Sequence, residues 1–220
     1  MSPNAYYPMF ADLHGRRCLV VGGGMVAQRK VATLLRCGAQ VTVVSPTLTR
    51  RLAADARQGR VRWVRRRARP ADLRTAWIVF AATDDQRIND LVSRTAARAR
   101  IFANIVDQIP LCSFIAPAIV TRGSLTIAIS TGGGSPSLAK RLRRDLADAI
   151  GSDYARMLRL LRSLRGIAKQ RLPNYRDRKK YFDRLIRGRV FDLVRGHRVA
   201  AARREALALL EASAGRNGSP

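Results

Sequence analysis

The chain has 220 residues, and 47% of them are hydrophobic. It is therefore long enough to bury a core and too apolar to be disordered. No apolar run reaches the roughly 18–20 residues that cross a bilayer, and the first residues lack the features of a secretion signal. We therefore expect a cytoplasmic protein with no membrane contact. The three cysteines contain no CxxC pair, which argues against a metal site or a disulfide framework.

The formal net charge is +27, which predicts a preference for anionic partners. Residues 1–148 carry 24 basic and 9 acidic side chains, and residues 149–220 carry 18 and 6. The excess is therefore spread along the chain rather than confined to a tail. Charge alone leaves three interpretations open: binding of a polycarboxylate metabolite, binding of nucleic acid, and a solvated arginine-rich surface.

Short apolar segments alternate with segments of helical spacing in the first half of the chain. The pattern predicts helices over 26–37 and from the capping residue Asp84 or Asp85 through Ala99. The strands are expected at 17–22, 41–45, 61–64, 77–82 and 101–106. Strand and helix in alternation are typical of an α/β fold with a Rossmann-type parallel sheet.

The pattern changes after this region. Two strands are expected at 114–120 and 125–130, joined by a tight turn, with Pro117 indicating an edge or a bulge. A helix is expected from Ser137 to about Ile150, and the remaining chain is helical and poor in strands. We therefore predict three parts: a dinucleotide-binding domain over 1–113, a segment over 114–148 whose uncovered strands pair with a second copy, and a helical domain over 149–220.

A glycine-rich loop lies between the first expected strand and helix. Gly22, Gly24 and Ala27 fit the GxGxxA pattern in the strand–loop–helix context that dinucleotide binding requires. The helix N-terminus would supply N–H groups and a partial positive charge for phosphates. The usual acidic residue after the second strand is absent, since Ser45-Pro46-Thr47 stands there. Arg50 and Arg51 follow, which leaves NADP open beside NAD.

A set of further segments extends this pattern. In chain order they are Phe10-x-x-Leu13, Val20–Gly24, Val26-Ala27, Arg29-Lys30, Ala81–Asp85, Asn104–Asp107, Phe114-Ile-x-Pro117 and Ile129–Pro136. Together they resemble the precorrin-2 dehydrogenase/sirohydrochlorin ferrochelatase family, which includes the N-terminal part of sirohaem synthase and its free-standing relatives. The resemblance covers nearly the whole chain and is weaker after about residue 150.

The resemblance implies an activity and an assembly. The activity is NAD-dependent oxidation of precorrin-2 to sirohydrochlorin in sirohaem biosynthesis, and in some relatives the same aspartate also serves insertion of Fe²⁺. The assembly is a homodimer that exchanges strands through the middle segment. The substrate is a polycarboxylate, and guanidinium groups pair with carboxylates through two parallel hydrogen bonds. The arginine-rich composition therefore suits it, and we expect tetrapyrrole rather than nucleic-acid partners.

The resemblance also implies site residues. The essential aspartate falls on Asp107, at the carboxyl edge of the sheet where ligands bind, and can act as general base. From the residues alone, a turn role is the favoured interpretation of Asp107. The expected cofactor-binding residues are Gly22, Gly23, Gly24, Met25, Val26, Ser45, Pro46, Thr47 and Thr83, and the expected substrate-binding residues are Asn104, Thr131, Gly132 and Ser135.

Two other functions fit parts of the sequence. One is a basic Rossmann-type regulator that senses NAD(H) and binds nucleic acid through its helical end. The other is a different small-molecule dehydrogenase on the same fold. The segments 104–107 and 130–136 distinguish them, because a regulator would not need these residues. The glycine segment between Thr131 and Ser135 can also be read as a flexible connection.

Overall fold

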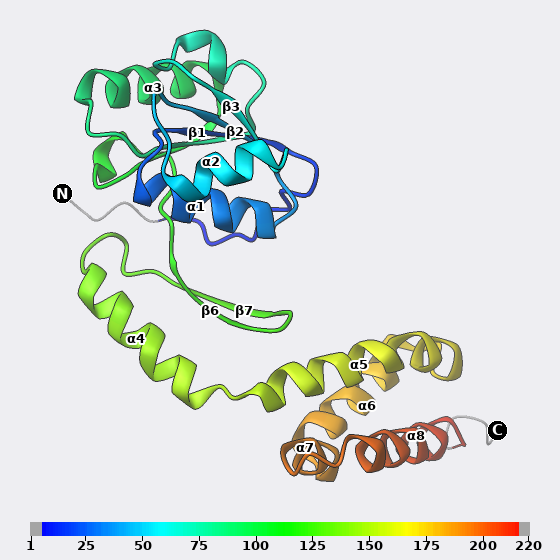
Figure 1. Cartoon of the computed structure of the whole chain (residues 1–220). Coiled ribbons are helices and arrows are strands. Elements are labelled where there is room, and N and C mark those ends of the chain that lie inside the picture. Colours follow the sequence, from blue (N-terminus) through cyan, green and yellow to red (C-terminus); the bar gives the residue numbers. More distant parts are fainter. Residues whose placement is uncertain (1–5, 216–220) are drawn as a thin grey trace. The chain divides into compact units, whose positions relative to one another are not determined.

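The computed structural model describes residues 6–215. The chain forms two compact units (Figure 1). The sheet unit holds the chain up to Ala116 together with Gly132–Gly134, and the helical unit holds Pro117–Thr131 and the chain from Ser135 onward. Each unit is described by itself below. The predicted division into three domains stays a prediction.

The sheet unit is built on five parallel strands. They are β1 (Arg17–Val21), β2 (Gln40–Val44), β3 (Val61–Val64), β4 (Ile78–Ala81) and β5 (Phe102–Ile105). Their order in the sheet is β3-β2-β1-β4-β5, and Val20 in the central strand is in register with Val43 on one side and Phe80 on the other. The Rossmann-type sheet expected from the sequence is confirmed.

Three helices cover the two faces of this sheet. They are α1 (Met25–Arg36), α2 (Arg50–Arg57) and α3 (Gln86–Ala99), with short 3₁₀ turns η1 (Pro70–Leu73) and η2 (Ile109–Leu111) in the loops. Side chains alternate across a strand, so Val20 packs in the core under α1, whereas Leu19 and Val21 pack in the core under α3. Burial on both faces explains why the strands are almost uniformly apolar.

The helical unit begins with a two-stranded antiparallel sheet. It consists of β6 (Ala118–Arg122) and β7 (Leu125–Ile129), and α4 (Pro136–Ala149) follows. The expectation that the first of these strands starts at Phe114 was wrong. The Phe114 ring packs edge-on against Phe80, with ring centroids 5.4 Å apart. This contact holds the segment before Pro117 in the sheet unit, so β6 begins only after the proline.

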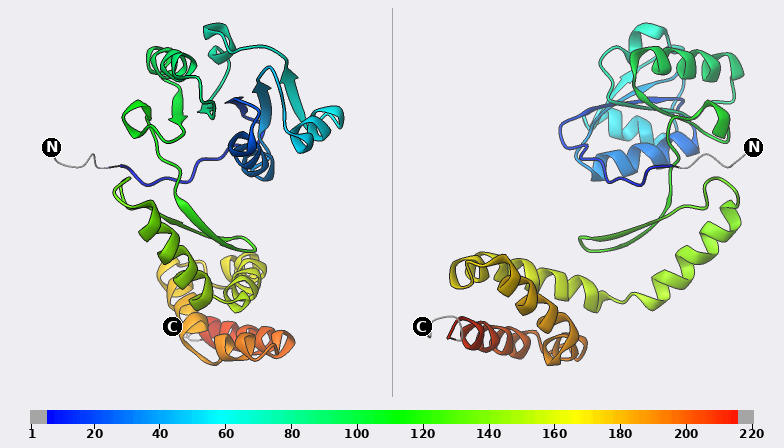
Figure 2. Two further views of the ribbon diagram at one scale, coloured as in Figure 1. Left: turned by 60° about the vertical axis from the view of Figure 1, so that its left-hand side comes forward. Right: turned by 180° about the vertical axis from the view of Figure 1, so that it is seen from behind.

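Four further helices complete the helical unit. They are α5 (Ser152–Arg171), α6 (Tyr175–Arg187), α7 (Arg189–Arg195) and α8 (Val199–Gly215), and they pack as one bundle, coloured from yellow-green to red in Figure 2. Tyr181 is 2% exposed at its centre, and its hydroxyl donates a hydrogen bond to the carbonyl of Ala206 at 3.0 Å. Burial raises the pKa of Tyr181 to about 12. No helix within residues 6–215 is long and apolar enough to span a bilayer.

Candidate functional site

The backbone around the loop after β1 leaves no room for a side chain at its first two glycines. Gly22 has a φ of +110°, and a Cβ there would lie 2.1 Å from the carbonyl oxygen of Ala82. A Cβ on Gly23 would lie 1.9 Å from the carbonyl oxygen of Thr47. These separations are far shorter than van der Waals contact, so a larger residue at either position would displace the ends of β2 and β4.

Gly24 differs from both of its neighbours. A Cβ at this position would meet no atom within 4 Å, and its φ of −80° is accessible to any residue. Nothing in the described fold therefore requires glycine here. Gly24 is the N-cap of α1 and makes no side-chain capping bond, so it leaves open space in front of the N–H groups of the first turn. A pyrophosphate fits this arrangement, since phosphates bind at helix N-termini.

The first turn of α1 is suited to an anionic and partly apolar ligand. It contains no acidic residue that would repel a phosphate. Met25 is 64% exposed, which is high for a large apolar side chain, whereas Ala27 is fully buried and keeps the helix close to the sheet. The expected Met25 is thus available to a cofactor, and Ala27 has the packing role that the motif assigns to it.

The ends of β2 and β4 flank this loop. Ser45 is buried, and its carbonyl accepts a hydrogen bond from the Trp63 indole at 2.9 Å. Pro46 and Thr47 are exposed. On the other side, Thr83 is half-buried, and its hydroxyl accepts the backbone N–H of Asp85 at 3.2 Å. The structure therefore places these expected cofactor residues around the glycine loop.

Asp107 lies in a turn directly after β5, at the carboxyl edge of the sheet. It is exposed, and its backbone has a φ of +60°. Residues other than glycine seldom adopt this left-handed conformation, although aspartate and asparagine tolerate it best. Such strain of about 1–3 kcal/mol persists where the surrounding structure imposes it and is frequent at functional sites. The turn role expected from the residues and the catalytic role implied by the resemblance are therefore compatible.

The loop around Asp107 is held by Cys112 and Asn104. The Cys112 thiol lies 3.2 Å from both the N and the O of Ile105 and 3.3 Å from the carbonyl of Gln108. Asn104 is 7% exposed, and its amide donates to the carbonyl of Phe114 at 3.2 Å. Its N–H donor is therefore engaged in holding the loop, and burial raises the pKa of the Cys112 thiol. We interpret Asn104 as a residue that positions this turn.

Lys30 on α1 is a residue of this site that the sequence analysis did not single out. Its Nζ lies over the Phe80 ring at 5.2 Å from the centroid, a cation–π contact. Burial, and then the charge of Arg29, lower the pKa of Lys30, whereas Cys112 and Asp107 act in the opposite direction. The ammonium group is therefore half-buried and within electrostatic reach of Asp107. The sequence shows Lys30 only as part of the Arg29-Lys30 motif. Its role could not be predicted, because Phe80 and Asp107, which lie near it in the fold, are 50 or more residues away along the chain.

The glycine-rich segment before α4 is more ordered than a flexible connection. Thr131 Oγ1 donates to the carbonyl of Ser135 at 3.1 Å and accepts its N–H at 3.2 Å. Ser135 Oγ in turn caps α4 by accepting the N–H of Leu138. Gly132 and Gly133 have φ values of +62° and +85°, and a Cβ on Gly133 would lie 2.6 Å from Cδ1 of Ile109. Within the sheet unit, Gly133 thus lies beside Ile109, two residues after Asp107.

Comparison with known families gives three successive matches. Residues 9–118 match a family described as putative NAD(P)-binding. Residues 122–149 match the family described as sirohaem biosynthesis protein central, and residues 153–210 match the sirohaem synthase dimerisation region. The first match spans half of the chain and agrees with the glycine loop and the sheet order. The chain is therefore a nicotinamide-dinucleotide-binding protein of the Rossmann type.

The most informative similarities are to sirohaem enzymes. The chain is 40% identical to siroheme synthase of Xylella fastidiosa (strain M12) over 214 residues, which cover 97% of this chain and 44% of that protein. It is 41% identical to siroheme synthase of Methylobacillus flagellatus over 196 residues, covering 89% and 42%. The chain thus spans less than half the length of these curated relatives.

A solved structure covers the chain more fully. "SirC, precorrin-2 dehydrogenase" superposes with a TM-score of 0.76 and 28% identity, covering 94% of this chain and 99% of the other. Together with the three family matches, this similarity identifies the chain more narrowly than its fold does. The chain belongs to the precorrin-2 dehydrogenase/sirohydrochlorin ferrochelatase family, as its sequence motifs predict.

Proposed function

We propose that the chain oxidises precorrin-2 to sirohydrochlorin, with NAD as the hydride acceptor. The single observation that carries this proposal is the open space beside Gly24 at the N-terminus of α1. It is the one glycine of the loop whose small size the described fold does not explain. Asp107 follows a strand of the same sheet, and the chain matches SirC over nearly its full length.

The residues around the glycine loop would hold the cofactor. The N–H groups of the first turn of α1 would bind the pyrophosphate, Met25 would contact the dinucleotide, and the segment after β2 would lie beside the adenosine. When bound, the nicotinamide ring supplies the hydride acceptor. The choice of NAD over NADP is part of the proposal. Arg51, a candidate partner for the 2′-phosphate of NADP, lies 3.6 Å from Asp55 in an ion pair.

Asp107 would accept the proton that the substrate loses. Its carboxylate is exposed, and its strained turn is fixed by the Cys112 and Asn104 contacts. A fixed orientation matters because a general base must lie within hydrogen-bonding distance of the proton it removes.

The direct test is an assay with purified protein. Precorrin-2 is mixed with NAD or with NADP, and the absorbance of sirohydrochlorin is followed, with and without Fe²⁺. We expect conversion with NAD at a higher kcat/KM than with NADP. Conversion that depends on NADP alone would contradict the assignment of NAD as cofactor. Formation of sirohaem when Fe²⁺ is added would show that the chain also inserts iron. Within residues 6–215, no three His, Cys, Asp or Glu side chains are grouped as a metal site.

We also propose that the active form is a cytoplasmic homodimer joined through residues about 114–148. A two-stranded sheet such as β6–β7 is marginally stable on its own. The helix α4 buries none of its side chains within this chain, and Ile119, Leu138 and Leu142 are 42%, 50% and 38% exposed. A partner copy would extend the two-stranded sheet and cover these exposed apolar side chains.

Light scattering tests this assembly. We expect a mass of twice 24.4 kDa for the wild type at micromolar concentration, and a monomer for the Leu138→Asp/Leu142→Asp variant. Met9→Asp, which changes a 53% exposed side chain outside both residues 114–148 and the region 153–210 that matches a dimerisation family, is the matched control and should remain dimeric. A wild-type protein that is monomeric while it oxidises precorrin-2 would refute the proposed dimer.

A further inference from the structure

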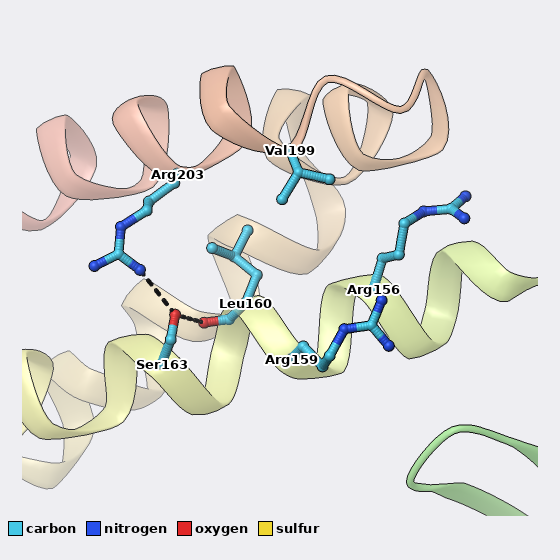
Figure 3. Close-up of a pocket in the computed structure, with 6 residues that line it drawn as sticks. All are labelled: Arg156, Arg159, Leu160, Ser163, Val199 and Arg203. Atoms are coloured by element: carbon cyan, nitrogen blue, oxygen red, sulfur yellow. Dashed lines mark hydrogen bonds between the residues drawn. The ribbon is translucent and has the colours of Figure 1, made fainter.

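A groove in the helical unit lies between α5 and α8, and three of its six lining residues are arginines. Its residues are Arg156, Arg159, Leu160, Ser163, Val199 and Arg203. Figure 3 shows the three arginines arranged along it, with Arg203 extending from α8 toward α5. Grooves between packed helices are normally filled by apolar side chains. Polar and charged residues at four of six positions therefore need a different explanation.

The charges in this groove are not compensated by its own lining. None of the six lining residues is acidic. The ion pairs described within the helical unit, Arg141–Asp145 and Arg195–Asp153, use other arginines. The three arginines are spread along the groove, with Arg203 at one end and Arg156 at the other (Figure 3). An anion between them would be attracted by each of these charges.

Arg156 gives the groove a specific unsatisfied donor. Its Nη1 donates to Ser152 Oγ at 2.8 Å, but its Nε is buried and has no hydrogen-bond partner among the described residues. A buried donor without a partner is rare and unfavourable. Arg203 Nη1 is paired with Ser163 Oγ at 3.1 Å, which holds it beside the groove. The Nε and the second Nη of a guanidinium can bind a carboxylate through two parallel hydrogen bonds, and at Arg156 this requires the side chain to turn so that its buried Nε faces the groove.

The size of the groove limits what it can accept. Its volume of about 250 Å³ is below the roughly 300–1,000 Å³ of sites that enclose a whole drug-sized ligand. It would therefore hold a substituent of a larger molecule. We propose that the groove between α5 and α8 binds a carboxylate side chain of the tetrapyrrole substrate, with Arg156, Arg159 and Arg203 as its ligands. This inference rests on the proposed function and names the residues that recognise the substrate.

The test measures binding without turnover. Full-length protein is titrated with uroporphyrin, a stable porphyrin bearing carboxylates around its ring, in the absence of NAD, and porphyrin fluorescence is followed. Arg156→Gln is expected to weaken binding about tenfold or more, because a charge-assisted bidentate contact is lost. Arg165→Gln removes the same charge from an exposed position on α5 outside the groove and should change affinity less than twofold. Arg156→Lys keeps the charge but not the planar pair of N–H donors, and its affinity for uroporphyrin should lie between those of Arg156→Gln and Arg165→Gln.

Three results would overturn this inference. The first is equal affinity of Arg156→Gln and Arg165→Gln when both variants keep the wild-type melting temperature. The second is displacement of uroporphyrin by inorganic phosphate more readily than by succinate, a dicarboxylate of comparable charge. The third is a greater loss of duplex DNA binding than of porphyrin binding in Arg156→Gln, which would assign the groove to nucleic-acid phosphates. Failure of the proposed function is distinguishable, because a protein that does not oxidise precorrin-2 can still show the Arg156-dependent binding.

Discussion

Replacement of Asp107 by asparagine is expected to lower the rate of precorrin-2 oxidation by about 10²–10⁴-fold, the usual contribution of a general base. The amide has nearly the size of the carboxylate but does not accept a proton. Asparagine also tolerates the left-handed backbone that Asp107 adopts, so the turn after β5 should keep its conformation. The loss should therefore fall on kcat, and NAD affinity should change little because the glycine loop is untouched.

The measurement is steady-state oxidation together with calorimetric titration of NAD. Lys30→Met extends it, because this variant removes the ammonium near Asp107 but keeps an apolar chain over Phe80. We expect a loss on the order of tenfold for Lys30→Met, equivalent to about 1.4 kcal/mol, because a half-buried ammonium within electrostatic reach of Asp107 is lost. Lys30→Arg should retain most of the rate. A folded, dimeric Asp107→Asn protein that oxidises precorrin-2 at the wild-type rate would remove Asp107 from the mechanism.

Replacement of Gly24 by aspartate is expected to abolish dinucleotide binding while the fold remains intact. The new carboxylate would occupy the open space in front of α1 and repel the pyrophosphate. The same side chain would suit the fold, because Gly24 is an N-cap with an extended backbone and no capping bond. Aspartate is a preferred N-cap residue. The melting temperature should therefore be equal to or above that of the wild type.

Two variants serve as controls for this prediction. Gly166→Asp makes the same change at another glycine with open space around it, in the middle of α5, and should leave NAD affinity unchanged. Gly22→Ala should instead destabilise the protein, since its Cβ would overlap the carbonyl oxygen of Ala82. Calorimetry that gives wild-type NAD affinity for a folded Gly24→Asp protein would contradict the proposed cofactor site.

The parallel sheet could be predicted from the sequence because its strands are buried on both faces. Apolar runs ending in glycine, proline or aspartate locate β1, β2, β4 and β5 within one or two residues. The helix α2 was missed for the opposite reason. It buries only Leu52 and Asp55, and the carboxylate of Asp55 is paired with Arg60. A short helix with one buried apolar side chain has too little periodicity to be recognised.

The chemistry of the site could be predicted only where one residue type determines it. The glycine loop meets this condition. Gly22 and Gly23 leave room for neighbouring backbone carbonyl groups, and Gly24 leaves room for a ligand. The role of Asn104 does not meet this condition. Its substrate-binding role stays a prediction, and the sequence pattern did not indicate that its amide bonds the carbonyl of Phe114, ten residues later. Lys30 and the arginine groove depend on side chains brought together by tertiary packing, and such contacts leave no pattern in the chain.

The proposed reaction couples oxidation of precorrin-2 to reduction of NAD. Its most direct test measures NADH and sirohydrochlorin together in one anaerobic reaction of the purified wild-type protein. We predict equimolar formation of the two products, and neither product from Gly24→Asp above the rate without enzyme. Sirohydrochlorin that accumulates without NADH, or at the same rate when NAD is omitted, would contradict the account.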